Sequence, residues 1–211
     1  MPVDAALYPV NLVVDGRPSL VVGGGRVAAR KAEGLAACGA EVHVVATRVG
    51  PEVRALSGAG VTWEERPYQR GEVAGYRLAV SATGDPEVDG AVFEDGEAAG
   101  VWVNSADDPA RCSFTLPAVL RRGPVTVTVS TGGHSPALAA WLRDRLGADV
   151  GPEYEILAGL LSAERDALRA EGRSTEGLDW RSALDSDMLD LIRSGHLQQA
   201  KERLQACLSS S

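Results

Sequence analysis

The sequence predicts an α/β protein in which a parallel sheet comes first, a small α+β segment follows and a helical region ends the chain. Three observations support this order. Short β-branched runs alternate with helical patterns in the first third of the chain. Residues 123–131 alternate valine with threonine, which indicates a strand with one solvent-facing side. Beyond residue 151, the apolar residues follow the spacing of amphipathic helices.

Five strands are predicted for the parallel sheet. A buried strand over 18–22 precedes three glycines, and the small and apolar residues after them predict a helix closed at Gly39. The next strand spans 41–46. Further strands are expected at 61–63, 77–82 and 100–104. Residues 85–99 are long enough to form a crossover helix, so the order is that of repeated βαβ units.

The second half of the chain follows a different pattern. Ser135 and Pro136 suit the N-cap and first position of a helix. Its apolar stripe consists of Leu138, Leu142 and Leu146. Residues 172–175 predict a break between the helices that come later. We therefore expect three parts: residues 1–112, 113–150 and 151–211.

Composition excludes several classes of function. The 211 residues carry a formal charge of −8 and the sequence pI is about 4.9, which disfavours general binding of nucleic acid or anionic membrane. No apolar run reaches the ~18 residues that a membrane helix needs, and the first ten residues lack a basic region and a cleavage site. We therefore expect a cytoplasmic protein.

The cysteines and histidines indicate no disulfide framework and no metal site. Cys38, Cys112 and Cys207 are odd in number and far apart, so reduced, structural thiols are expected. The three histidines show no metal-ligand spacing either.

The strongest local motif is the glycine turn after the first strand. Gly23, Gly24, Gly25 and Ala28 fit the GxGxxA dinucleotide fingerprint between a strand and a helix. The backbone N–H groups at the helix start, from Arg26 and Val27 onward, would face a pyrophosphate. This predicts a Rossmann-like domain that binds NAD, the alternative being a purely structural turn.

The residue that normally binds the adenosine ribose is missing from the second strand. An acid is expected about 20 residues after the glycines. The sequence instead has Thr47, which is suited to bond the ribose, and Arg48, which keeps a 2′-phosphate open, so the fingerprint does not decide between NAD and NADP. Ala82 and Thr83 after the fourth strand, and Asn104 at the end of the fifth, are expected to line the same crevice; an ordinary turn is the alternative for residues 82–83.

A basic segment stands out within this acidic chain. Residues 111–145 carry a local charge of +4, which suggests an anionic small substrate. The five arginines are Arg111, Arg121, Arg122, Arg143 and Arg145, against the single acid Asp144. Arg121 and Arg122 are candidate substrate ligands, or else plain turn residues. Arg143 and Arg145 are more simply read as the solvated face of a helix.

Two further motifs are candidates for chemistry. Asp107 and Asp108 follow the fifth strand, where open α/β sheets place their ligands, although an Asx turn into Pro109 would also explain them. A second glycine turn before a helix forms a candidate anion cradle, with a simple turn and N-cap as the alternative. Its candidate substrate-binding residues are Thr131, Gly132, Gly133, His134 and Ser135.

With these motifs, the chain resembles the precorrin-2 dehydrogenase and sirohydrochlorin ferrochelatase family, including the N-terminal module of siroheme synthase. The matching stretches are YPVNLVVDGRPSLVVGGGRVAARKA from Tyr8, NSADDPARCSFTLPA from Asn104 and TVSTGGHSPALA from Thr128. The likeness extends over almost the whole chain and includes the helical C-terminal region.

The resemblance implies NAD-dependent oxidation of precorrin-2 to sirohydrochlorin in siroheme biosynthesis, with Asp107 as the catalytic group. Some relatives also insert Fe²⁺ into sirohydrochlorin. The family's many-carboxylate substrate would give the basic segment a purpose. The resemblance further implies a homodimer formed through residues 113–150, an NAD-binding domain over 1–112 and a helical domain over 151–211. A different class of function, a non-catalytic NAD(H)-sensing module, is the alternative.

Overall fold

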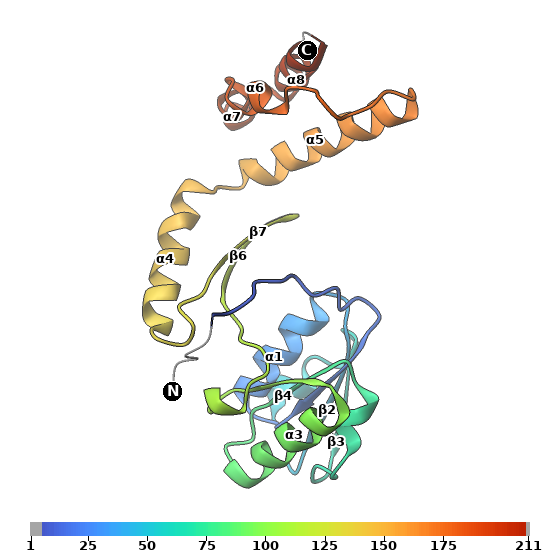
Figure 1. Ribbon diagram of the computed structural model, residues 1–211, viewed down its shortest axis with the longest axis vertical. Coiled ribbons are helices and arrows are strands. Elements are labelled where there is room, and N and C mark those ends of the chain that lie inside the picture. The colour runs from blue at the N-terminus through green and yellow to red at the C-terminus, as the bar shows by residue number, and fades with distance from the viewer. Residues whose placement is uncertain (1–5, 210–211) are drawn as a thin grey trace. The chain divides into compact units, whose positions relative to one another are not determined.

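The first unit is built on a five-stranded parallel sheet in the order β3-β2-β1-β4-β5. The computed structural model describes residues 6–209, and Figure 1 shows the sheet with helices on its faces. The strands are β1 (Pro18–Val22), β2 (Glu41–Ala46), β3 (Val61–Glu65), β4 (Leu78–Ser81) and β5 (Trp102–Ser105). Helices α1 (Arg26–Ala36), α2 (Pro51–Arg54) and α3 (Pro86–Ala99) connect them, with the short 3₁₀ turns η1 (Glu72–Gly75) and η2 (Pro109–Arg111).

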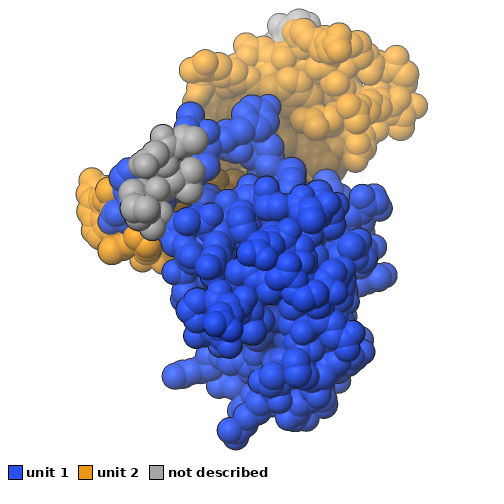
Figure 2. Space-filling model, turned by 60° about the horizontal axis from the view of Figure 1, so that its bottom comes forward, with its two compact units in different colours: residues 1–116, 132–135 blue, residues 117–131, 136–211 orange. Residues whose placement is uncertain are grey.

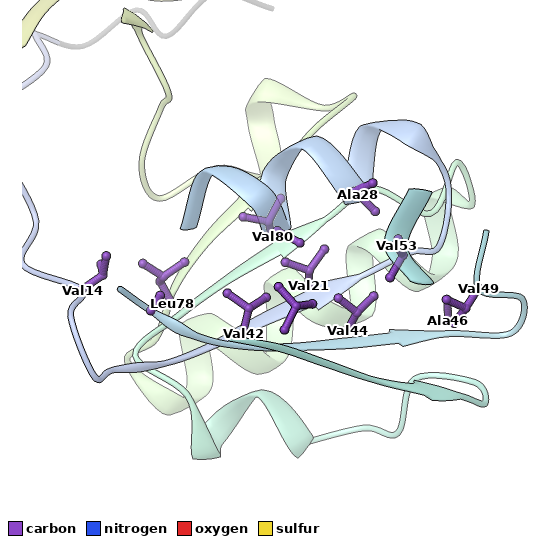
Figure 3. Close-up of a cluster of buried hydrophobic side chains, with 14 residues drawn as sticks. Val14, Val21, Ala28, Val42, Val44, Ala46, Val49, Val53, Leu78 and Val80 are labelled. Carbon is purple, nitrogen blue, oxygen red and sulfur yellow. The ribbon is translucent and has the colours of Figure 1, made fainter. Parts of the chain in front are cut away.

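The sheet is buried on both faces, which explains why its strands are apolar runs without alternation. Successive side chains point to opposite faces, so Val21 packs toward α1 whereas Val22 packs toward α3. Figure 3 shows the cluster on the α1 side, where Val21, Val44 and Val80 lie beneath Ala28. The small residues of α1 allow the helix to approach the sheet closely.

The second unit contains a hairpin and five helices. Strands β6 (Ala118–Arg122) and β7 (Val125–Val129) pair antiparallel across Gly123 and Pro124. The helices are α4 (Pro136–Asp149), α5 (Glu153–Ala170), α6 (Trp180–Leu184), α7 (Met188–Arg193) and α8 (Leu197–Ser209). The last four enclose their own apolar core, in which Met188 and Leu204 are fully buried.

The chain forms two compact units, and the expected division into three parts stays a prediction. One compact unit comprises the chain up to Leu116 together with Gly132–Ser135, and the other comprises Pro117–Thr131 and Pro136–Ser211 (Figure 2). Segments 113–150 and 151–211 therefore share a unit for most of their length. The assignment of dimerisation to 113–150 stays a prediction.

The α/β fold class is confirmed, with corrections at the hairpin. The predicted strand over 123–131 begins only at Val125, because Gly123 and Pro124 form the turn. Arg121 and Arg122 are not turn residues but the last two residues of β6, a strand that the sequence pattern did not reveal. Among the residues that the structure describes, no helix is both long and apolar enough to cross a membrane. The N-terminal residues 1–5 lie outside the described part.

Candidate active site

Two of the three glycines after β1 are required by close contacts with the neighbouring backbone. Gly23 has a φ of +127°, and a Cβ there would lie 2.3 Å from the carbonyl oxygen of Ala82. A Cβ at Gly24 would lie 2.0 Å from the carbonyl oxygen of Arg48. The turn is also tied to β2, because the Gly23 N–H donates to the Val45 carbonyl at 2.8 Å. These contacts fix the turn between the ends of β2 and β4.

Gly25 has a different role. A Cβ at this position would meet nothing within 4 Å, so the turn opens here instead of packing against the chain. Gly25 is the N-cap of α1, and no side chain caps this helix end. The helical ladder starts with the Ala29 N–H, which leaves the N–H groups of Arg26 and Val27 ahead of it. Open space before an uncapped helix N-terminus fits the pyrophosphate of a dinucleotide.

The loop after β2 lies against this turn. The Gly50 N–H donates to the Gly24 carbonyl at 2.9 Å, and the side chains of Thr47 and Arg48 are exposed. Both residues are thus placed at the carboxyl end of β2, where the adenosine ribose is bound in this type of sheet. Their assignment as cofactor ligands stays a prediction.

The Thr83 hydroxyl is engaged within the chain. It donates to Oδ1 of Asp89 at 2.8 Å and accepts from the Asp85 N–H at 3.0 Å. Asp89, which is only 4% exposed, was not singled out from the sequence because it reads as one more acid on the first turn of α3. Together these bonds fix the loop after β4. Ala82 and Thr83 consequently present backbone, not a free hydroxyl, toward the glycine turn.

Asn104 holds the loop that carries the two aspartates. Its Nδ2 donates to the Phe114 carbonyl at 2.9 Å, and the side chain is buried. Ser113 adds a second clamp, because its Oγ accepts from the Val103 N–H at 2.7 Å. The segment between these residues is therefore pinned to β5. The structure gives the Asn104 amide nitrogen a partner within the chain, and its predicted contact with the cofactor remains a prediction.

The two adjacent aspartates have different roles in the structure. Asp108 accepts from the Ala110 N–H at 3.0 Å and lies 3.5 Å from Nε of Arg111, so it caps η2 as an Asx turn would. Asp107 is exposed, and its carboxylate makes no hydrogen bond or ion pair with any described residue. It follows Ala106, whose N–H donates to the Ser81 carbonyl at 2.9 Å and continues the β4–β5 ladder. The carboxylate left for chemistry is that of Asp107, at the same sheet edge as the glycine turn.

Arg111 locks the aspartate loop onto α3. Its guanidinium donates to the Pro86 carbonyl and packs against Gly90, where a Cβ would lie 3.1 Å from Nη1. One of the five arginines in the basic segment therefore has a structural role.

Two buried hydroxyls at this edge have no protein partner. Ser81 and Ser105 are register partners at the ends of β4 and β5, and their Oγ atoms make no hydrogen bond within the described residues. Successive side chains of a strand alternate between the two faces of the sheet. Each serine comes two positions after a residue of the α3-side core, so both serines lie on the face that α3 covers. Sequence reasoning missed them, because serine at a strand end is unremarkable.

Cys112 behaves as a structural thiol. It donates weakly to the carbonyls of Ser105 at 3.3 Å and Asp108 at 3.4 Å. Burial raises the pKa of the Cys112 thiol, which keeps it protonated and poorly nucleophilic. The prediction of a reduced thiol is consistent with this setting.

The remaining substrate-binding candidates are divided between the units. Gly132, Gly133, His134 and Ser135 belong to the first unit, and both glycines have positive φ, as a cradle-forming turn requires. Thr131 and the hairpin arginines belong to the second unit.

The two hairpin arginines differ. Arg122 donates to the carbonyls of Val150 at 3.0 Å and Gly147 at 3.4 Å, so it caps the C-terminal end of α4. Arg121 is exposed at the end of β6. Arg121 in turn donates from Nη1 to Oγ1 of Thr126 at 3.5 Å, and its assignment as a substrate ligand stays a prediction.

Comparison with known proteins assigns the class. The family model described as "Putative NAD(P)-binding" matches residues 10–118, more than half of the chain, and the chain belongs to this family. A second model, "Sirohaem biosynthesis protein central", matches residues 122–148.

Individual relatives narrow the class. The chain is 36% identical to the siroheme synthase of Chromobacterium violaceum over 202 residues, which are 94% of this chain and 43% of that protein. It is 34% identical to the siroheme synthase of Nitrosococcus oceani over 95% of this chain and 43% of that protein. The chain thus spans less than half the length of these relatives.

A solved structure matches over nearly its full length. "SirC, precorrin-2 dehydrogenase" superposes with a TM-score of 0.73 at 25% identity, covering 95% of this chain and 98% of that one. The resemblance seen in the sequence motifs is confirmed by these comparisons.

Proposed function

We propose that this protein oxidises precorrin-2 to sirohydrochlorin with NAD⁺ in siroheme biosynthesis. The observation that carries the proposal is that two features lie at the carboxyl end of the same sheet. One is the open glycine turn at Gly25, and the other is the carboxylate of Asp107, which has no partner among the described residues. The match to a precorrin-2 dehydrogenase over 95% of this chain supports it.

In the overall reaction, precorrin-2 and NAD⁺ give sirohydrochlorin, NADH and a proton. When bound, NAD⁺ would accept the hydride that leaves the macrocycle. The chain's residues bind and orient: the first N–H groups of α1 hold the pyrophosphate, and the glycine turn lets it approach. Asp107 accepts the proton that leaves the macrocycle, as a carboxylate held in reach of the reacting carbons can do. Asn104 and Asp108 act indirectly, because they fix the loop on which Asp107 stands.

The substrate is a polyanion, and we propose that the turn Gly132–Ser135 of the first unit binds its carboxylates; contacts from Thr131 and Arg121 of the second unit remain predictions. The backbone N–H groups of the second glycine turn suit an anion, and a guanidinium pairs with carboxylate in bidentate fashion. Insertion of Fe²⁺ as a second substrate remains a prediction from the resemblance, as does a cytoplasmic location.

We also propose a homodimer. Strands β6 and β7 pack against α4, yet large apolar side chains on the hairpin and on this helix stay exposed. Val119 on β6 and Trp141 on α4 are exposed by 38% and 55%. Burying such residues against a second copy would stabilise both. Sedimentation of the pure chain tests this, since a monomer at micromolar concentration contradicts it.

The activity is tested by mixing the pure protein with precorrin-2 and NAD⁺ under anaerobic conditions. We expect NADH and sirohydrochlorin to form in equal amounts, followed by their separate absorption bands. The alternative, a sensor of NAD(H), predicts cofactor binding without any change of the tetrapyrrole spectrum, and that result would refute the enzymatic proposal.

A further inference from the structure

The adenosine end of the cofactor site lacks the carboxylate that normally selects NAD. That carboxylate bonds the ribose 2′-OH and repels a 2′-phosphate. At the end of β2, Ala46 is buried and the next two residues, Thr47 and Arg48, are exposed. The loop cannot drift away from the turn, because the Arg48 carbonyl abuts Gly24 and the Gly50 N–H donates to the Gly24 carbonyl.

Two arginines belong to the segments that form this end of the site, and neither has a partner among the described residues. Arg26 is the first residue of α1 and Arg48 follows β2; both are exposed, and neither makes a hydrogen bond or ion pair with any described residue. Other arginines nearby in the fold are engaged. Arg54 pairs with Glu65 at 2.5 Å, and Arg66 pairs with Glu64 and with Glu72. The two acids at the end of β3, Glu64 and Glu65, are therefore paired with Arg66 and Arg54 and not with Arg26 or Arg48.

One carboxylate of the same loop has to be set against these cations. Glu52 lies in the first turn of α2, and its Oε2 is 3.4 Å from where a Gly50 Cβ would stand. Its single negative charge is outnumbered by Arg26 and Arg48. A guanidinium also matches a phosphate with two parallel hydrogen bonds, which a hydroxyl cannot offer it.

We propose that the ribose end of this site accepts a 2′-phosphate, so that the chain binds NADP⁺ as well as NAD⁺, with Arg48 as the principal contact and Arg26 as the second. The inference rests on the proposed dinucleotide site and extends it to the 2′-phosphorylated class of cofactor. It concerns binding, and it holds whether or not NADP⁺ supports turnover.

Calorimetric titration of the full chain tests it without a tetrapyrrole. The probes are NAD⁺, NADP⁺, 5′-ADP and 2′,5′-ADP, which isolate the contribution of the 2′-phosphate. We expect the Kd of NADP⁺ to lie within about tenfold of that of NAD⁺, a difference below about 1.4 kcal/mol. Because exposed charges are screened, the NADP⁺ affinity falls more steeply with salt than that of NAD⁺.

The variant Arg48→Ala is expected to weaken NADP⁺ and 2′,5′-ADP by about tenfold or more while NAD⁺ changes by less than about threefold. Arg30→Ala, which removes an exposed arginine one turn further along α1, is the matched control and leaves all affinities unchanged. If NAD⁺ binds but NADP⁺ is more than about tenfold weaker, or if Arg48→Ala weakens both alike, the inference is overturned and the proposed function stands. If no dinucleotide binds, the proposed function fails as well.

Discussion

At the residue scale, neighbouring residues of the same type carry out different tasks, and contacts decide which. Gly23 and Gly25 both belong to the fingerprint, yet one is required by the protein's own backbone and the other faces open space. Asp107 and Asp108 are likewise adjacent, but only Asp108 caps a turn. These assignments depend on backbone geometry a few residues away, which a sequence pattern does not specify.

The two glycines should therefore respond oppositely to substitution. Gly23→Ala introduces a Cβ at φ +127° against the Ala82 carbonyl, so we expect the free energy of unfolding to fall by about 2 kcal/mol or more. Gly25→Asp adds an N-cap acceptor to α1 and should raise the free energy of unfolding by roughly a few tenths of a kcal/mol. The same Asp repels the pyrophosphate, so NAD⁺ affinity should drop about tenfold or more.

Urea unfolding and calorimetric NAD⁺ titration measure both effects. Gly25→Ala is the control for the loss of glycine without an added charge; alanine is a poorer N-cap than glycine, so it should lower the free energy of unfolding by up to about 1 kcal/mol and weaken NAD⁺ less than Gly25→Asp does. An unchanged NAD⁺ affinity in Gly25→Asp would show that the turn is structural only.

At the element scale, ionisable side chains attach the irregular segments to the sheet's helices. The loop before η1 is held on α3 by Asp95, which accepts from the Tyr68 hydroxyl at 2.8 Å and the Gly71 N–H at 2.7 Å. Arg70 pairs with the same carboxylate at 2.9 Å. Burial, reinforced by the Asp95 carboxylate, raises the pKa of Tyr68 well above its usual value.

This shift predicts how stability depends on alkaline pH. A tyrosine in the unfolded chain ionises near pH ~10, whereas Tyr68 in the folded chain stays protonated, so unfolding releases a proton above that pH. The contribution of Tyr68 is fully present below pH ~10 and is lost as the pH rises further. Tyr68→Phe should show a shallower decline in the free energy of unfolding between about pH 10 and 11.5.

Denaturant unfolding across that pH range provides the measurement. The pKa of Tyr76 is also raised by burial, and this residue remains in both proteins as a common background. Identical slopes for the parent chain and Tyr68→Phe would contradict the assignment.

The strands of the parallel sheet could be predicted from the sequence, because burial on both faces requires continuous apolar runs. The strands at 18–22 and 41–46 were predicted with the boundaries that the structure has. Strand β6 was missed, because its sequence, three apolar residues followed by two arginines over Ala118–Arg122, shows neither a continuous apolar run nor an alternation, although its positions alternate between half-buried and exposed. Its partner β7 was seen because valine and threonine alternate along it.

At the scale of the whole molecule, the sequence motifs predicted which segments lie together at the carboxyl end of the sheet, but not which of their side chains are engaged within the chain. Residues 23–25, 47–48 and 107 meet at one edge of the sheet because parallel strands end together. The commitments of Arg111 and Arg122 to their own chain were not predictable, since each depends on a carbonyl more than 20 residues away in sequence. Thr83 bonds Asp89, six residues further along, but only because the loop after β4 folds back onto the first turn of α3. The local charge of +4 over residues 111–145 therefore overestimates the number of arginines that a substrate could reach.

The most direct test of the account compares Asp107→Asn with Asp108→Asn in the oxidation of precorrin-2 by NAD⁺, with NAD⁺ binding and unfolding measured alongside. We expect Asp107→Asn to lose at least ~100-fold in kcat while it binds NAD⁺ and folds like the parent chain, because of these two aspartates Asp107 is the one whose carboxylate has no partner among the described residues. Asp108→Asn keeps an N-cap acceptor, so it should retain most of its activity. Full turnover by Asp107→Asn, with equal NADH and sirohydrochlorin, would contradict the account.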